Sequence, residues 1–262
     1  MTSFARIFLW TCLILAALIS TTIGIAIGAK SLGLTTAWII ILAGIIPALI
    51  AIFTTTLIEK KITDQSIAIC VSSLGLGKPC PKQLWIGALC LLPILTAYIV
   101  MFFGLHTSLK LAPGFPFLLL KLVIAQGIAE EVVFRGFVFR HLRVGRSFWR
   151  AALLSASIFS IAHLSHLFKG VSTQILIDMS VSIGFTFVMA PALALLFEYG
   201  GNVIWGCSLL HLGFDSINLF AEATSATISL ESLIYAIGIL GSVLMLFWLG
   251  PHLMPAQART AA

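Results

Sequence analysis

The stretch FPFLLLKLVIAQGIAEEVVFRGFVFRH, residues 115–141, decides the fold of this chain. It is long and apolar enough for a membrane-spanning helix, yet three charged residues, Glu130, Glu131 and Arg135, lie within six consecutive positions of it. A charged side chain near the centre of a bilayer costs roughly 2.5–3.5 kcal/mol on insertion scales. Because charges at such a position usually serve a function, we expect this helix to carry the functional site.

The composition of the whole chain is that of a membrane protein. Hydrophobic residues make up 60% of the 262 residues and charged residues 9%, whereas a soluble domain has roughly 25% charged residues. These values exclude a soluble function. The net charge of +6 comes mainly from basic residues in short connections, which we expect to face anionic lipid, and no nucleic-acid partner is expected.

Apolar runs separated by polar, glycine and proline clusters predict an all-α, polytopic helical bundle with about eight transmembrane helices. The expected spans are 7–29, 34–58, 84–105, 115–141, 149–168, 173–198, 202–221 and 230–250. They form a single transmembrane domain, 1–262. Residues 1–114 supply the N-terminal helices, residues 115–221 the core that carries the polar motifs, and residues 222–262 the last helix and a short tail.

Lysine and arginine residues orient the bundle. Most of those in connections lie on the N-terminal side, and only Lys30, Lys110 and Lys169 lie on the opposite side. By the positive-inside rule, both termini are cytoplasmic, and we expect an integral protein of a bacterial-type cell membrane. The longest connection, 59–83, contains an apolar segment, 67–76, that is too short to cross and is expected at the membrane interface.

Polar residues of three predicted spans fall at one depth. Glu130 lies about a dozen residues before the turn between the fourth and fifth spans, and His163 lies a similar number after it. His211 lies about ten residues into the seventh span, and Asp215 follows one turn later on the same face. We therefore expect these four side chains to converge on one layer, nearer to the cytoplasm than to the exterior.

Each of these residues also has a structural interpretation. Glu131 and Arg135 have the i,i+4 spacing with the acid first, which favours an ion pair that lowers the cost of burial. Glu130 points about 100° away from Glu131, and a lone glutamate could be a buried acid bonded to His163. The combination of carboxylates and imidazoles at one depth favours a catalytic site over the separate structural roles. The histidines expected to be solvated are His106, His141 and His252.

Three motifs on successive spans resemble those of a known family. They read Glu-Glu-x3-Arg at 130–135, Phe-x3-His at 159–163 and His-x3-Asp at 211–215. In this order they resemble the CPBP family, also called ABI, of CAAX-protease-like and bacteriocin-processing intramembrane proteases. This family includes the type II CAAX prenyl endopeptidases. The resemblance covers about 115–221.

The resemblance implies an intramembrane endopeptidase that acts on a membrane-embedded or membrane-associated protein or peptide from a cavity open to the cytoplasm. In this interpretation Glu130 is the general base and activates a water together with His163. His211 and Asp215 then stabilise the oxyanion. The residues expected to support the site are Glu131, Arg135, Phe159 and Asn218.

The last position of the third motif is Asn or Asp in the family, and this chain has the aspartate, Asp215. An asparagine can donate a hydrogen bond to an oxyanion, whereas an ionised aspartate cannot. Asp215 is therefore either protonated, or it orients and charges His211, which alone donates. We expect the second arrangement.

No bound metal or other cofactor is expected, because the sequence lacks the His-Glu-x2-His pair that is typical of helical zinc sites. A zinc ion held by Glu130, His163 and His211 is the alternative.

Two other functions remain open. One is a non-catalytic membrane scaffold or regulator of the same family. The other is a small proton-coupled transporter, against which the lack of an internal repeat counts.

Overall fold

The computed structural model of the chain describes residues 4–107, 110–220 and 230–253. Within these ranges all regular elements are helices, apart from one isolated bridge between Leu111 and Phe220. The helical stretches there that are long and apolar enough to cross a membrane are Phe4–Ser31, Ala37–Thr63, Ile67–Gly104, Thr173–Tyr199 and Leu230–Gly250. The third is interrupted by a short loop. The all-α membrane fold is therefore confirmed, whereas the count of eight transmembrane helices stays a prediction.

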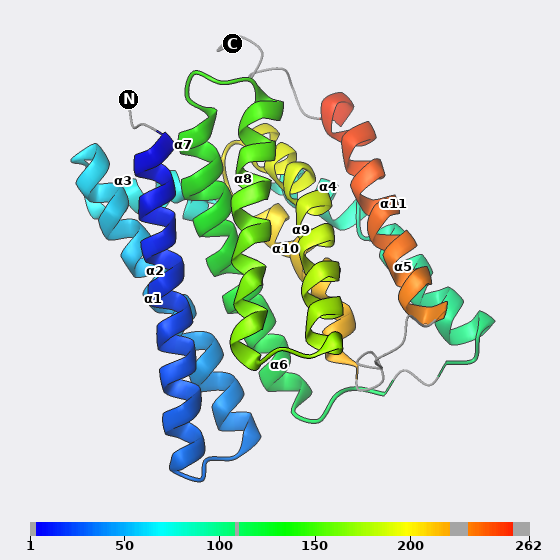
Figure 1. Ribbon diagram of the computed structural model, residues 1–262. Coiled ribbons are helices and arrows are strands. Elements are labelled where there is room, and N and C mark those ends of the chain that lie inside the picture. The colour runs from blue at the N-terminus through cyan, green and yellow to red at the C-terminus, as the bar shows by residue number, and fades with distance from the viewer. Residues whose placement is uncertain (1–3, 108–109, 221–229, 254–262) are drawn as a thin grey trace.

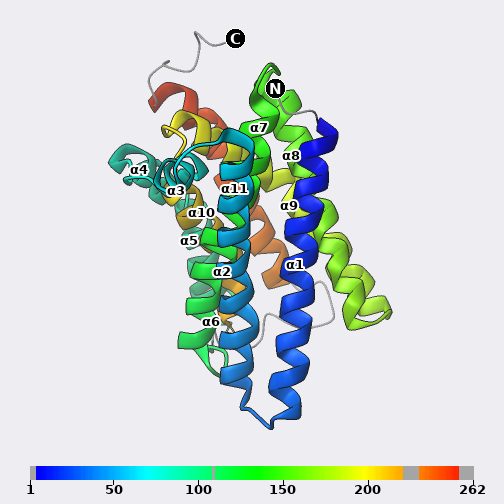
Figure 2. The same ribbon diagram turned by 90° about the vertical axis from the view of Figure 1, so that its left-hand side faces the viewer.

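The first two helices form an antiparallel hairpin (Figure 1). α1 (Phe4–Ser31) and α2 (Thr36–Thr63) pack along one another, and Gly33 in their connection has a φ of 67°. Figure 2 shows that the hairpin extends beyond the other helices at the end that carries its turn. Asp64 caps the end of α2, and its N–H donates a hydrogen bond to the carbonyl of Lys60 while its backbone is left-handed.

The apolar segment 67–76 forms two short helices, α3 (Ile67–Val71) and η1 (Ser72–Leu76). Its backbone turns at Gly75, which has a φ of 91°, and η1 packs against η4 (Val132–Phe139). A Cβ atom on Gly136 would overlap the backbone of Leu74. The glycine after the Glu-Glu-x3-Arg motif is therefore needed for a close approach of two backbones. The location of this segment at a membrane interface stays a prediction.

Residues 115–143 form one continuous rod, as expected for the span that carries the two glutamates. Its elements are α6 (Phe115–Lys121), η3 (Leu122–Glu130), η4 and α7 (Arg140–Arg143). The residues at the junctions keep right-handed helical angles, so the chain does not break there. η3 and η4 have the wider π-helical winding, which is rare and frequent at functional sites. Every residue of η4 is buried.

Two of the predicted spans are only partly α-helical. α8 (Phe148–Ala162) continues as the 3₁₀ helix η5 (His163–Lys169), and α10 (Trp205–Asp215) continues as the 3₁₀ helix η6 (Ser216–Leu219). A polar side chain bonds back to a carbonyl of the preceding turn at each change of winding, which competes with the regular helical bonds. His163 Nδ1 lies 3.2 Å from the carbonyl of Phe159, and the Ser216 hydroxyl donates to the carbonyl of Gly213 at 2.7 Å.

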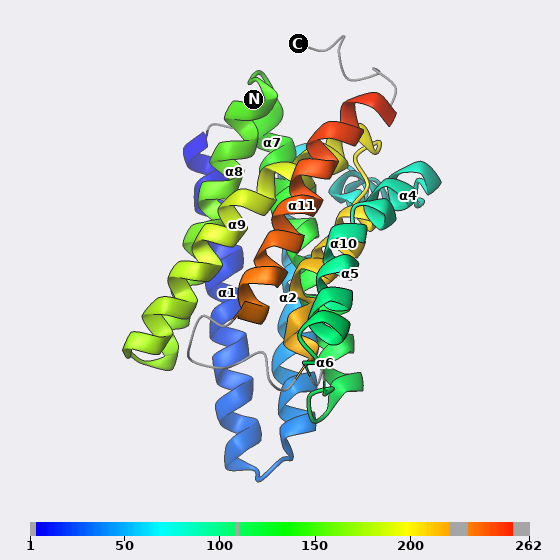
Figure 3. The same ribbon diagram turned by 90° about the vertical axis from the view of Figure 1, so that its right-hand side faces the viewer.

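The remaining helices complete the bundle. They are α4 (Pro81–Leu89), α5 (Leu92–Ile99), η2 (Val100–Gly104), α9 (Thr173–Tyr199) and α11 (Leu230–Leu253). The rod contacts α2, and it also contacts α8 and α10. Figure 3 shows α11 beside α5 and α9, which it contacts. α1 begins and α11 ends at the same end of the bundle (Figure 1).

Gln83 of α4 fixes the start of α10. Its side-chain oxygen accepts a hydrogen bond from the N–H of Gly206 at 2.9 Å, and its amide nitrogen donates to the carbonyls of Leu196 and Val203. Gln83 is fully buried, so these bonds replace those it would make with water. They hold in place the helix that carries the third motif.

The prediction that His141 is solvated is wrong. Its Nε2 lies 2.7 Å from Oε2 of Glu59, and only 10% of its side chain is exposed. The reason is that α7 continues the rod and packs beside the end of α2, which a sequence position in a connection does not reveal. His106 is exposed, as expected, and the side chain of His252 lies outside the described residues.

Candidate active site

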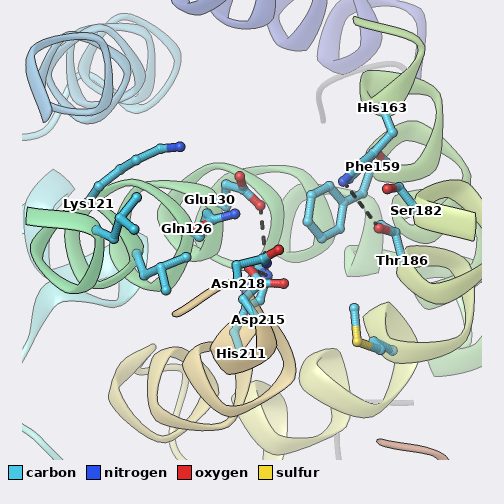
Figure 4. Close-up of a pocket in the computed structure, with 13 residues that line it drawn as sticks. Lys121, Gln126, Glu130, Phe159, His163, Ser182, Thr186, His211, Asp215 and Asn218 are labelled. Carbon is cyan, nitrogen blue, oxygen red and sulfur yellow. Dashed lines mark hydrogen bonds and ion pairs between the residues drawn. The ribbon is translucent and has the colours of Figure 1, made fainter. Parts of the chain in front are cut away.

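The rod, η5 and α10 bring the four predicted catalytic residues to one cavity. Glu130, His163, His211 and Asp215 all line it, and its volume is about 400 Å³ (Figure 4). η4 packs against α8, where Phe134 and Phe159 stack at 4.0 Å between ring centroids. This packing aligns the rod and α8 so that Glu130 and His163 reach the same level. The structure thus brings the four side chains together, while their roles stay predictions.

A buried network lies behind this cavity. Glu131 Oε1 lies 3.0 Å from Nη1 of Arg135 and 2.7 Å from Nδ1 of His211. The exposed fractions of these side chains are 0%, 1% and 4%, respectively. The i,i+4 ion pair is therefore present, and Glu131 also contacts a histidine 80 positions further along the chain. Because an ionised carboxylate only accepts hydrogen bonds, Nδ1 of His211 carries a proton. The other ring nitrogen, Nε2, faces the cavity.

The other nitrogen of His211 lies between two further carboxylates. Its Nε2 is 3.6 Å from Oδ2 of Asp215 and 3.9 Å from Oε2 of Glu130. The side chains of Asp215 and Glu130 are 21% and 28% exposed, so both are open to the cavity. Adjacent glutamates thus face different surroundings, since Glu131 is fully buried. Of the carboxylates around His211, Glu131 makes the shortest contact, and Asp215 stands beside the cavity-facing nitrogen.

Phe159 forms the apolar wall between the motifs. The Arg135 guanidinium lies 4.9 Å from the centre of its ring, which is a favourable position for a cation. The rings of His163 and His211 lie 5.4 Å and 6.1 Å from the ring of Phe159. A phenylalanine at this position therefore contacts residues of all three motifs, which gives the Phe-x3-His spacing a physical reason.

His163 stands apart from the carboxylates, beside α9 (Figure 4). Its Nδ1 lies 3.2 Å from the carbonyl of Phe159, and its Nε2 lies 3.4 Å from the hydroxyl of Thr186. A carbonyl can only accept, so Nδ1 carries the proton and Nε2 of neutral His163 is an acceptor. This nitrogen can hold a water but cannot donate to an oxyanion while the ring is neutral.

Several lining residues were not predicted from the sequence. Gln126 lies one turn before Glu130, and its buried Oε1 has no hydrogen-bond partner among the described residues. The sequence could have indicated this residue, because Gln126 is an amide in an apolar span and lies four residues before Glu130, on the same face of the helix. Thr186 and Ser182 of α9 also line the cavity, but hydroxyl residues are too common in membrane helices to be singled out. Asn218, predicted as a supporting residue, lies at the rim of the cavity and is exposed.

The alternative zinc site does not fit the arrangement of the described residues. No group of three or more His, Cys, Asp or Glu side chains among them is placed to hold a metal ion. Nε2 of His163 faces Thr186, whereas Nε2 of His211 faces Asp215 and Glu130, so the three residues do not converge on one point. We therefore assign no step to a metal, and the absence of a cofactor stays a prediction.

Comparison with known proteins gives one family match. Residues 112–217 match the family model described as type II CAAX prenyl endopeptidase Rce1-like. The match includes all three motifs and the four residues around the cavity. No curated protein matches the chain.

Proposed function

We propose that the chain, whose residues 112–217 match the type II CAAX prenyl endopeptidase Rce1-like family model, is an intramembrane endopeptidase with Glu130 as its catalytic base. The family supports a CAAX-type membrane protease in general. The proposed reaction is hydrolysis of a peptide bond of a membrane-associated protein or peptide near the cytoplasmic face.

The observation that carries this proposal is the different exposure of the two adjacent glutamates. Glu131 is closed off by Arg135 and His211, whereas Glu130 opens to the cavity. Of these two glutamates, only Glu130 can take a proton from a water beside a bound peptide, because Glu131 does not reach the cavity. The buried Glu131–Arg135 pair therefore suits a structural role that fixes the position of His211, and Glu130 suits the role of the catalytic base.

The cavity has the groups that hydrolysis needs. Glu130 takes a proton from a water that also bonds to Nε2 of His163, and the resulting hydroxide attacks the scissile carbonyl carbon. The carbonyl oxygen becomes an oxyanion, which accepts a hydrogen bond from Nε2–H of protonated His211. Glu130 then returns its proton to the leaving amine nitrogen as the C–N bond breaks.

Asp215 acts on His211 in this proposal, not on the substrate. An ionised aspartate at 3.6 Å from Nε2 favours the protonated ring that donates to the oxyanion. Glu131 has the same effect from Nδ1 and also fixes the ring orientation. This supports the expectation that Asp215 orients and charges His211.

We further propose that both termini are cytoplasmic. The arginines of the turn that follows the rod lie at the end of the bundle where α1 begins and α11 ends (Figure 1). Basic connections favour the cytoplasmic side of a membrane.

The test compares membrane peptides by mass spectrometry from cells with the wild-type protein and cells with Glu130→Gln. The matched control is Asp178→Asn, which makes the same carboxylate-to-amide change at an exposed position on α9. We expect wild-type and control cells to share cleavage products that are missing with Glu130→Gln. Identical products in all three strains, with an unchanged phenotype, would favour the non-catalytic scaffold.

A further inference from the structure

A second cavity lies at the end of the rod, between the last turn of α2 and the turn that joins α7 to α8. Its volume is about 470 Å³. Three basic side chains line it, those of His141, Arg146 and Arg150, and no acidic side chain is among its lining residues. It shares no lining residue with the candidate active site. The lining of this cavity therefore has basic side chains without acidic ones to balance them.

The two arginines that precede Arg146 in the sequence form ion pairs with glutamates. Arg140 donates from Nη2 to Oε1 of Glu59, and Arg143 donates from Nε to Oε2 of Glu198 at 2.8 Å. A second bond of 3.1 Å joins Nη2 of Arg143 to Oε1 of Glu198, which is the bidentate geometry that suits arginine.

The arginines that line the cavity have no acidic partner among the described residues. Arg146 donates to the carbonyl of Leu142 at 3.0 Å, and Arg150 is exposed. Glu59, the carboxylate bonded to the lining residue His141, is 1% exposed and holds both Arg140 and His141. Its charge is therefore directed away from the cavity, which keeps a net positive charge.

Aromatic residues place this end of the bundle at a membrane surface. Trp149 follows the turn, is exposed, and stacks on Phe247 at 5.5 Å. Trp10 lies at the same end, with Nζ of Lys61 5.4 Å from its ring centre. Tryptophan is enriched at the level of lipid headgroups, where its apolar ring and polar N–H meet both phases.

We propose that this cavity binds the phosphate of an anionic phospholipid headgroup through Arg146 and Arg150. Basic pockets between membrane helices on the cytoplasmic side suit such headgroups, and the arginine fork matches phosphate oxygens. Ile62 and the exposed Val144 line the same cavity and provide an apolar contact for the start of an acyl chain. This contact favours a lipid over free phosphate.

A lipid bound here joins two parts of the fold. Ile62 and Thr63 belong to the last turn of α2, whereas Arg146 and Arg150 lie in or after the turn that follows the rod. The bound headgroup thus connects the α1–α2 hairpin to the helices that carry the active site. The site does not depend on the proposed peptidase activity.

The test is native mass spectrometry of the purified full-length protein in a neutral detergent, with phosphatidylglycerol, phosphatidylcholine or inorganic phosphate added. The variant is Arg146→Gln with Arg150→Gln. Its control, Lys78→Gln with Lys82→Gln, removes the same charge from exposed positions in and before α4. Each basic residue near an anionic surface contributes about 1 kcal/mol. We therefore expect the variant to bind phosphatidylglycerol roughly 25-fold more weakly, by the relation of ~1.4 kcal/mol per tenfold, and the control to bind like the wild type.

Arg150→Gln alone keeps the proposal testable if the double variant does not fold. This side chain is exposed, so its loss should leave the fold intact and weaken binding about fivefold. Equal binding of phosphatidylglycerol and phosphatidylcholine would overturn the proposal, as would an equal loss in the lysine control. Inorganic phosphate that binds as tightly as phosphatidylglycerol would show a free-phosphate site instead.

Discussion

Removal of one charge from the Glu131–Arg135 pair should destabilise the fold strongly. The two side chains are 0% and 1% exposed and lie 3.0 Å apart. Glu131→Leu leaves a buried guanidinium without its partner, and Arg135→Met leaves a buried carboxylate. Breaking a buried ion pair in this way costs about 3–5 kcal/mol. Each single variant should therefore lose a stability of that size.

The double variant Glu131→Leu with Arg135→Met separates stability from activity. It leaves no uncompensated charge of this pair, and replacing a buried pair by apolar residues is often close to neutral for stability. We expect it to be more stable than either single variant. It should still be inactive, because Nδ1 of His211 loses the carboxylate at 2.7 Å that orients the ring.

The assay is equilibrium or thermal unfolding in detergent, combined with cleavage of a membrane-protein fraction. Exposed Asp178→Asn is the control, and it should change the free energy of unfolding by less than about 0.5 kcal/mol. If the losses of the two single variants simply add in the double variant, the residues do not act as a pair. Full activity of the double variant would refute the role given to Glu131.

Three further changes test other parts of the account. Gly136→Ala should destabilise the fold by about 1–3 kcal/mol in unfolding experiments, because its Cβ would overlap the backbone of Leu74; an unchanged stability would contradict that packing. Asp215→Asn should lower kcat by about tenfold, since a neutral amide supports protonated His211 less well than a carboxylate does; equal or higher activity across neutral pH would show that an ionised aspartate is not needed. Gln126→Ala should raise KM by about 2- to 10-fold, because its unpartnered Oε1 can accept a substrate N–H; a change in kcat alone would assign it another role.

Local geometry explains what could be predicted from the sequence. The spacing of Glu131 and Arg135 predicts their ion pair, because residues four apart in a helix are neighbours. The fixed rise of a helix places Glu130 and His163 at a similar depth on antiparallel neighbours, and the structure brings both to one cavity. The family resemblance found from the three motifs is confirmed by the family match.

Contacts between distant segments could not be predicted in the same way. The bond between Glu131 and His211 depends on how α10 rotates against the rod, which Gln83 of α4 helps to fix. The pairing of His141 with Glu59 joins positions 82 residues apart. No periodicity in the sequence indicates either contact, so the second role of Glu131 and the burial of His141 appear only in the fold.

The central claim is that Glu130 activates water to hydrolyse a peptide bond. The most direct measurement incubates purified wild-type protein or Glu130→Gln in liposomes with a membrane-protein fraction in water labelled with ¹⁸O. Mass spectrometry then identifies new peptide C-termini. The account predicts that the wild type produces new C-termini that carry the heavy oxygen and that Glu130→Gln produces none of them. The same labelled C-termini from Glu130→Gln, or none from the wild type, would contradict it.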